Sequence, residues 1–311
     1  MRRAFSDTLA RLADENPRIT FLTGDLGFQV FEAFKTKHGP RYINVGVAEA
    51  QMVCMAAGLA ATGWQPVCYS IASFLTNRAY EQIRVSVHYP GLPVILVGAG
   101  GGYSYAGSGI THHAVEDFGL MSLMPNMTVV APGDPEELRM LLPQMFQLKG
   151  PSYLRIGAFG EPVITALEPA VLGKWRLIKS GRKLTIVSTG DLLGNVAEAC
   201  RLLESEGVAP THYQAHTVKP LDEKVLQKIS TESEAVVVVE EHGPVGGLGS
   251  AVQLWLAAHR PNLPVIRLGA PDQLALGNPH RKELQHRLGI GAADIAETLR
   301  KLWRTPKSAQ A

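Results

Sequence analysis

The chain of 311 residues has few cysteines and no long apolar segment, and each absence excludes a class of protein. The three cysteines, Cys54, Cys68 and Cys200, have neither metal-ligand spacing nor an even-numbered disulfide pattern. All lie in apolar or helical stretches, so we expect small buried core residues in a reducing compartment. No run approaches the roughly 18 apolar residues of a membrane span, and the first residues lack the apolar stretch of a signal peptide. We therefore expect a soluble, cytoplasmic protein that does not bind membranes.

An excess of one charge is also missing. The 30 Lys and Arg residues face 28 Asp and Glu residues, a formal net charge of +2, and no basic stripe accompanies it. Nucleic acid is therefore not an expected partner. The nearest basic cluster, Lys179, Arg182 and Lys183, precedes an apolar strand and is typical of a solvated linker. Hydrophobic residues at 46% and charged residues at 19% match an ordinary globular protein.

What the chain does contain is an alternation of short β-branched runs and helical patterns along its whole length. This pattern predicts mostly parallel sheets covered by helices on both faces, and the length allows two such domains. We therefore predict an α/β protein with two doubly wound, mostly parallel sheet domains, over 1–165 and 183–311. An irregular linker is expected over 166–182, and a disordered polar tail over Lys307–Ala311.

The same patterns locate individual elements. In the first domain, strands are predicted at Thr20–Thr23, Tyr42–Val45, Pro66–Ser70, Val94–Val97 and Thr128–Ala131, and helices at Ala48–Thr62, Asn77–His88 and Pro135–Leu148. Asp134 is the expected cap of the last of these helices. In the second domain, strands are predicted at Leu184–Thr189, Ala235–Glu240 and Val265–Leu268, and helices at Leu193–Glu206, Gly249–His259 and Ala292–Leu302.

Glu49 is the first candidate functional residue. It lies at the junction between a predicted strand and a helix made almost entirely of small and apolar residues. Such a carboxylate is either a first-turn acidic residue stabilised by the helix dipole or a half-buried acid with a chemical task. First-turn acidic residues are common, so the local pattern alone favours the first explanation.

Thr111-His112-His113 is the second candidate, and it follows a glycine-rich stretch over 98–109. We expect a long loop after a buried strand, where ligands bind in open α/β sheets. Consecutive histidines rarely face one metal ion, so proton transfer or hydrogen bonding is the favoured role. A surface loop with incidental histidines is the alternative. The glycine turns at 190–195 and 243–249 are interpreted as structural, since the second carries Pro244 and lacks the later acidic residue of a dinucleotide site.

Several segments, taken in order, resemble the pyrimidine-binding and C-terminal domains of transketolase, deoxyxylulose-phosphate synthase and the beta subunits of 2-oxo acid dehydrogenases. The resemblance covers nearly the whole chain. The segments that carry it are Thr23-Gly24-Asp25-Leu26, Asn44–Gln51, Ser73-Phe74-Leu75, Arg78–Gln82, Thr111-His112-His113 with Glu116-Asp117, Pro125-Asn126-Met127, Ala131-Pro132, Gly150–Arg155 and Glu240–Gly249.

The resemblance implies a thiamine-diphosphate enzyme and assigns roles to residues. Glu49 is similar to the family glutamate that hydrogen-bonds the aminopyrimidine ring and so activates the cofactor, which overturns the capping explanation. His112 matches the histidine that contacts the reacting substrate oxygen. The remaining assignments come from the same alignment: Asp25, Phe74 and Tyr80 toward the cofactor, and Arg3, Gln29, Arg78, Ser108 and Arg155 toward the substrate.

The family's diphosphate domain holds Mg²⁺ through a Gly-Asp-Gly motif, which this sequence lacks. The resemblance therefore implies a partner, an N-terminal transketolase subunit with the metal and diphosphate ligands, in an α2β2 assembly. No metal ligand is expected on this chain. Self-association through both of its domains is expected as well.

Three aligned positions depart from the family pattern. Ser108 replaces an acid that contacts substrate hydroxyls, Gly100 replaces a histidine, and Gln29 replaces a phosphate-binding serine. The substrate pocket is therefore expected to be altered. Transfer of a two-carbon ketol unit is the leading hypothesis. The alternatives are a beta subunit of a 2-oxo acid dehydrogenase or decarboxylating synthase, and a non-enzymatic regulatory, scaffolding or nucleotide-binding subunit.

Overall fold

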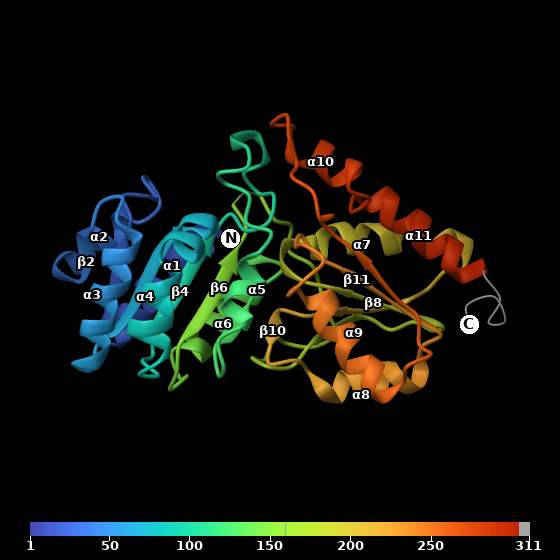
Figure 1. Cartoon of the computed structure of the whole chain (residues 1–311), viewed down its shortest axis with the longest axis horizontal. Helices are drawn as coiled ribbons and strands as arrows, with labels where there is room; N and C mark the ends of the chain where they lie inside the picture. Colours follow the sequence, from blue (N-terminus) through green and yellow to red (C-terminus); the bar gives the residue numbers. More distant parts are fainter. Residues whose placement is uncertain (159, 305–311) are drawn as a thin grey trace.

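Two sheets, one of seven strands and one of five, organise the two halves of the chain (Figure 1). The computed structural model describes residues 1–158 and 160–304. The elements of the first half are α1 (Arg2–Glu15), β1 (Ile19–Thr23), α2 (Glu32–His38), η1 (Gly39–Arg41), β2 (Tyr42–Asn44), α3 (Glu49–Ala61), β3 (Gln65–Ile71), η2 (Phe74–Arg78), α4 (Tyr80–Gln82), η3 (Ile83–His88), β4 (Ile95–Ala99), η4 (Ala106–Ser108), α5 (Asp117–Ser122), β5 (Thr128–Val130), α6 (Pro135–Met145) and β6 (Ser152–Ile156).

The second half begins with an edge strand and continues as an α/β unit. Its elements are β7 (Arg176–Lys179), β8 (Leu184–Ser188), η5 (Gly190–Leu192), α7 (Leu193–Leu202), η6 (Glu204–Glu206), β9 (Thr211–Gln214), β10 (Thr217–Lys219), α8 (Glu223–Glu232), β11 (Ala235–Val239), α9 (Leu248–His259), β12 (Val265–Leu268), α10 (Arg281–Arg287) and α11 (Ala292–Arg304). In the described residues, no helix is both long enough and apolar enough to cross a membrane.

The first sheet has the strand order β10-β5-β6-β4-β3-β1-β2, and all neighbours are parallel except β10 and β5. The second has the order β12-β11-β8-β9-β7, with β7 antiparallel to β9. Parallel strands buried on both faces are built from continuous apolar runs, as in β11, where Ala235–Val239 is fully buried. The predicted fold class is confirmed by this arrangement.

Alternate residues of the strands supply the two faces of each sheet. In β1, Phe21 belongs to a core that packs under α1, α2 and α6, whereas Leu22 belongs to the core under α3. The core that contains Leu22 continues into the second half, where it includes Val236 and Val238 of β11. A third cluster fills the other face of the second sheet beneath α7 and α11. The two halves therefore share one apolar core.

Most predicted elements agree with the structure to within a few residues. The predicted helix at Asn77–His88 is a more irregular run, because η2 and η3 are π-helical turns on either side of α4. The structure adds elements that the patterns do not predict: α1, α2, α5, α8, α10, β6, β7, β9 and β10. The predicted tail Lys307–Ala311 lies outside the described residues.

The expected linker over 166–182 is wrong in its second part. Residues Arg176–Lys179 form β7 and pair with β9, so the second sheet begins inside the predicted linker. In addition, β10 crosses back and pairs with β5 of the first sheet. Both strands are short edge strands that pair antiparallel, so neither produces the long apolar run by which the central strands are found. The boundary of the two domains otherwise remains a prediction.

Cys54 also differs from expectation, since it is exposed whereas Cys68 and Cys200 are buried. Cys54 lies on α3, which is apolar on both faces, and only one face of α3 packs on the sheet. Met52 and Val53 on that face are fully buried, whereas Met55 is 37% exposed. A helix that is apolar all round leaves one face uncovered within this chain.

Asp134 caps α6, as predicted. Its Oδ1 accepts a hydrogen bond from the N–H of Glu137 at 2.8 Å, and its Oδ2 accepts one from the N–H of Ile164 at 3.0 Å. The carboxylate is completely buried. It therefore stabilises a helix start and also fixes the chain that leaves the first sheet toward β7.

We expect Asp134→Ala to lower the free energy of unfolding by about 1–2 kcal/mol, because it leaves one buried and one part-buried N–H group without an acceptor. Denaturant unfolding of the purified chain measures the change. Glu136→Ala is the matched control, since Glu136 is exposed and pairs with Arg139 in the same helix. The control is expected to change the free energy by less than about 0.5 kcal/mol. Equal effects of the two substitutions would contradict the assigned role.

Candidate active site

The main site residues predicted from the sequence lie on loops at the carboxyl ends of neighbouring strands. Asp25 follows β1, Glu49 follows β2, Phe74 follows β3 and His112 follows β4. These strands are adjacent in the first sheet in the order β4-β3-β1-β2, so their loops meet along one edge. In open α/β sheets, ligands bind at this edge.

Glu49 is the first residue of α3, and its side chain is only 1% exposed. Ser70 at the end of β3 donates a hydrogen bond from Oγ to Glu49 Oε1 at 2.9 Å, and Arg78 donates from Nη1 to Oε2 at 3.3 Å. The carboxylate oxygens thus bond to side chains of other elements and not to the N–H groups of the helix start. A buried carboxylate of this kind requires charged or hydrogen-bonding partners, and both are present. The geometry is that of a held acid, not of a cap.

A row of ring contacts leads away from this acid. The guanidinium of Arg78 lies over the ring of Phe74, with the Cζ atom 4.2 Å from the ring centroid. Phe74 in turn meets the imidazole of His112 edge-to-face, with centroids 5.0 Å apart. The Oγ of Ser73 donates a hydrogen bond to the carbonyl of Thr111 at 3.0 Å, which ties the two loops together. Four predicted residues, Glu49, Arg78, Phe74 and His112, are therefore brought into one site.

The row continues through two residues that the sequence analysis did not identify. The imidazole of His112 meets the ring of Tyr105 edge-to-face at a centroid distance of 5.9 Å. The hydroxyl of Tyr105 accepts a hydrogen bond from Nη1 of Arg2 at 3.3 Å. The only local signals were a large aromatic residue within a glycine-rich loop, and a pair of arginines at the start of the chain.

The environment of His112 favours its neutral form. Burial lowers the pKa of its imidazole, and the nearby His113 and Arg78 lower it further. The Nδ1 atom lies 2.9 Å from Oγ1 of Thr111. A neutral imidazole can both donate and accept a hydrogen bond, which suits the role predicted for it. His113, by contrast, is buried and lies against the Ala106 carbonyl and the ring of Tyr103.

Asp25 and Tyr80 occupy the margins of the site. Asp25 adopts a left-handed backbone conformation with φ of 60°, and its Oδ1 accepts a hydrogen bond from the Asn44 amide at 2.8 Å. This contact joins the loops after β1 and β2. Tyr80 is half-buried and packs against the apolar core of the first sheet. The cofactor contacts of Asp25 and Tyr80 remain predictions.

Arg155 is held by contacts within the chain, and its predicted role toward the substrate remains a prediction. Its side chain is 8% exposed and forms an ion pair with Asp117 at 3.3 Å. Its Nη2 donates a hydrogen bond to the Glu241 carbonyl at 2.9 Å, and its guanidinium lies over the ring of Phe118. These contacts place Arg155 at the junction of the two halves. The negative charge of Asp117 compensates the charge of Arg155 there, so Arg155 links the two halves of the chain.

Arg3 and Gln29 lie together, but apart from the row of contacts. Both line a surface pocket of about 530 Å³, together with Met1, Arg2 and Asp7 among others. Arg2 is thus shared between this pocket and Tyr105. The predicted substrate roles of Arg3 and Gln29 remain predictions.

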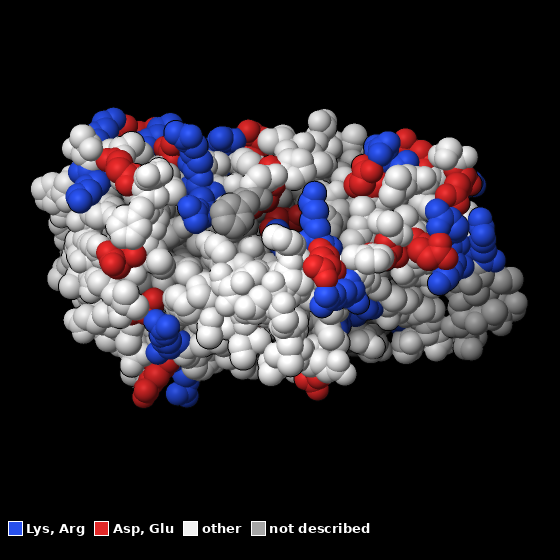
Figure 2. All heavy atoms as spheres, turned by 90° about the horizontal axis from the view of Figure 1, so that it is seen from above, with Lys and Arg blue, Asp and Glu red and all other residues white. Residues whose placement is uncertain are grey.

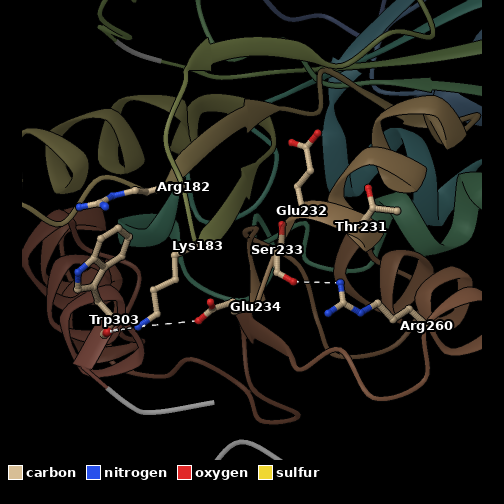
Figure 3. Close-up of a pocket in the computed structure, with 8 residues that line it drawn as sticks. All are labelled: Arg182, Lys183, Thr231, Glu232, Ser233, Glu234, Arg260 and Trp303. Carbon is tan, nitrogen blue, oxygen red and sulfur yellow. Dashed lines mark hydrogen bonds and ion pairs between the residues drawn. The ribbon is translucent and has the colours of Figure 1, made fainter.

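A second pocket, of about 500 Å³, lies on the second half of the chain (Figure 3). Its walls come from the segments that enter β8 and β11, at the opposite end of these strands from Glu241. Lys183 contacts the Trp303 carbonyl and Glu234, Arg182 lies over the Trp303 ring, and Arg260 donates to the Ser233 carbonyl. The basic cluster is therefore not a solvated linker, because Arg182 and Lys183 contact α11 and Lys179 of β7 pairs with Glu204.

The glycine turn at 243–249 is occupied from within the chain. Glu240 at the end of β11 accepts hydrogen bonds from the N–H groups of Leu248 and Gly249 at 2.7 and 3.0 Å. Those N–H groups open α9, and a phosphate would need them. The carboxylate thus takes the place that a nucleotide phosphate would require, in agreement with the structural interpretation of this motif.

Two domains of known protein families match the two halves of the chain. The pyrimidine-binding domain of transketolase matches residues 1–157, and the transketolase C-terminal domain matches residues 173–295. The chain belongs to the transketolase family. It corresponds to the part of the family that carries these two domains, as the resemblance predicted.

Individual relatives support this membership. A protein described as a transketolase C-terminal section, from Methanocaldococcus jannaschii, is 33% identical over 96% of this chain and 95% of its own length. A 6-deoxy-6-sulfo-D-fructose transketolase subunit from Clostridium is 35% identical over 88% and 85%. The 1-deoxy-D-xylulose-5-phosphate synthase of Chlorobium luteolum is 32% identical, and the chain spans 48% of its length.

Solved structures show the same fold. A split-gene transketolase, described as an inactive beta4 tetramer, has a TM-score of 0.86 and 32% identity, and the match covers 97% of both chains. A transketolase from Pichia stipitis has a TM-score of 0.81 at 18% identity, over 45% of its length. This chain is therefore transketolase-like and similar over its length to a separate subunit of a split enzyme.

We expect the pKa of His112 to lie below the ordinary histidine value of about 6.5. Replacement of Arg78 by glutamine removes a positive charge, which favours protonation, so the pKa should rise. It should not reach the ordinary value, since burial is the larger cause. Histidine NMR titration of the native chain and of Arg78→Gln measures both values. A native midpoint above 6.5 would contradict the assigned environment.

Proposed function

We propose that this chain is the pyrimidine-binding subunit of a thiamine-diphosphate-dependent enzyme that transfers a two-carbon ketol unit from a ketose to an aldehyde. A partner subunit contributes the diphosphate and Mg²⁺ ligands. The observation that carries the proposal is the buried carboxylate of Glu49 beside the half-exposed ring of Phe74, at the carboxyl edge of the sheet.

The residues present fit an aminopyrimidine ring. Phe74 offers an aromatic face for stacking, and Glu49 offers a carboxylate that can hydrogen-bond a ring nitrogen. Gly24 lies next to this carboxylate, and a Cβ atom at that position would stand 3.5 Å from Glu49 Oε1. The absence of a side chain at Gly24 leaves room for a ligand to approach the acid. Arg78 is 51% exposed, so its side chain can move aside when a ligand takes its place on Glu49.

Bound thiamine diphosphate supplies the nucleophilic carbon and the electron sink for cleavage of the carbon–carbon bond. Glu49 holds a proton or a hydrogen bond at its Oε2 atom, in a site from which water is largely excluded. His112 presents a neutral imidazole that can donate a hydrogen bond to a substrate oxygen or accept a proton from it. Phe74 and Tyr105 flank His112 and fix the orientation of its ring.

The relatives support a two-subunit enzyme. The split-gene transketolase matches this chain over 97% of its own length, and the Methanocaldococcus jannaschii transketolase C-terminal section does so over 95%. The uncovered apolar face of α3, with Met55 exposed, is suited to packing against a further chain. We infer an assembly of the α2β2 type that acts in carbohydrate metabolism in the cytoplasm.

A decarboxylating synthase is the second candidate, because several 1-deoxy-D-xylulose-5-phosphate synthases match over about half their length. Pyruvate as the donor distinguishes the two reactions, since a transketolase takes its two-carbon unit from a ketose. Reductive acylation of a lipoyl domain would identify a dehydrogenase subunit instead.

In the assembled complex, we expect Glu49→Gln to reduce kcat of ketol transfer by about 10²–10⁴-fold, because the amide cannot exchange a proton. The assembly itself should remain intact, as measured by light scattering. Glu81→Gln is the control, since Glu81 is an exposed carboxylate on the nearby α4 and should retain activity. Near-native turnover of Glu49→Gln would refute the proposed mechanism.

Activity should require both subunits. We expect cofactor-dependent transfer when this chain is mixed with an N-terminal transketolase subunit, thiamine diphosphate and Mg²⁺. Omission of either chain should abolish it, because each holds only half of the cofactor site. A panel of ketose donors, with pyruvate included, and of aldehyde acceptors measures the reaction. Transfer by this chain alone would contradict the division of the site between two chains.

A further inference from the structure

Tyr105 has a position that the family resemblance does not explain. It belongs to the loop between β4 and α5, and its ring lies directly over Gly100. A Cβ atom built at Gly100 would stand 2.0 Å from Cε2 of Tyr105, and the φ angle of Gly100 is +71°. A side chain at position 100 and the Tyr105 ring therefore exclude each other. In this chain the Tyr105 ring occupies the space.

The same ring separates two parts of the surface. On one side, it contacts the imidazole of His112, which leads through Phe74 to the acid at Glu49. On the other side, its hydroxyl accepts the hydrogen bond from Arg2, which lines the pocket shared with Arg3 and Gln29. Tyr105 thus stands between the reaction centre and a pocket with two arginines.

We propose that Tyr105 closes the distal end of the substrate site and restricts this enzyme to substrates that carry no phosphate at their distal carbon. The proposal rests on the proposed function. A substrate bound with its reacting oxygen at His112 would extend toward Tyr105. A phosphate at its far end would need to displace the ring before it could reach Arg2.

The charges near the loop support this restriction. A dianionic phosphate needs several donors, preferably a bidentate guanidinium. Arg155 of β6 lies over Gly101 of this loop and is committed to Asp117 and the Glu241 carbonyl. The hydroxyl of Tyr105 is a neutral group, which suits a hydroxyl or carbonyl oxygen at the end of a short sugar.

Removal of the ring should open the way to the pocket. In Tyr105→Ala, the space over Gly100 becomes free and Arg2 loses its contact with the phenol. A phosphorylated acceptor could then reach Arg2 and Arg3. In Tyr105→Phe, the ring still blocks the passage, so the preference for unphosphorylated substrates should largely remain.

The test compares glyceraldehyde and glyceraldehyde 3-phosphate as acceptors in the two-subunit complex, with L-erythrulose as the donor. The native complex should prefer glyceraldehyde. Tyr105→Ala should raise the ratio of kcat/KM for the phosphorylated to the unphosphorylated acceptor by at least about tenfold, mainly through KM, which is within the range that pocket filling achieves. Tyr105→Phe should change the ratio by less than about threefold. Tyr89→Ala is the matched control, because Tyr89 is an 88% exposed tyrosine outside the site.

A binding measurement separates this inference from the proposed function. Calorimetric titration of the loaded complex with glycerol 3-phosphate, which cannot react, should show at least about tenfold tighter binding to Tyr105→Ala than to the native complex. That result without ketol transfer would refute the proposed function and leave the role of Tyr105 standing. A native preference for the phosphorylated acceptor, or an unchanged ratio and unchanged binding in Tyr105→Ala, would overturn the role of Tyr105.

Discussion

The loop after β4 carries both His112 and Tyr105, and its conformation depends on one buried ionic network. Arg155 lies over Gly101, pairs with Asp117 and donates to the Glu241 carbonyl. The Glu241 carboxylate accepts the N–H of Tyr103 at 2.9 Å and also pairs with Arg281. Because the partners come from both halves of the chain, the second half holds in place the loop of the first half that carries Tyr105 and His112. Loss of one member of such a network commonly costs about 3–5 kcal/mol, since a charge is left buried and unpaired.

This network explains why glycines are concentrated in the loop. At Gly101 and Gly102, a Cβ atom would stand 1.9 and 2.3 Å from atoms of Arg155. The Arg155 side chain therefore occupies the space that any larger residue at these two positions would need. The glycine-rich stretch therefore packs directly against the buried side chain of Arg155. The loop held by this packing also carries His112, which contacts Phe74. The stability of the Arg155 network and the geometry of the site are therefore coupled.

The sequence was sufficient for the fold class and for the centre of the site, because both depend on local patterns. Apolar runs locate most of the parallel strands, although not β6 and β9, and the motifs containing Glu49, Phe74 and His112 follow strands that were located. The edge strands β7 and β10 escaped prediction, since they are short and pair antiparallel. Arg2, Tyr105 and the burial of Arg155 escaped it for another reason. Their roles depend on contacts between segments some 86 to 103 residues apart, which no local pattern encodes.

The division of the chain into a reaction centre and a distal pocket follows from the same contacts. Glu49 is buried at the start of a helix made mostly of small and apolar residues, so its charge must be balanced within a few ångströms, and Arg78 does this at 3.3 Å. Arg155 is engaged by Asp117 and Arg2 by Tyr105. Three arginines near the site thus have partners within the chain. A substrate that binds one of these arginines must first displace its partner, and this requirement contributes to the choice of substrate.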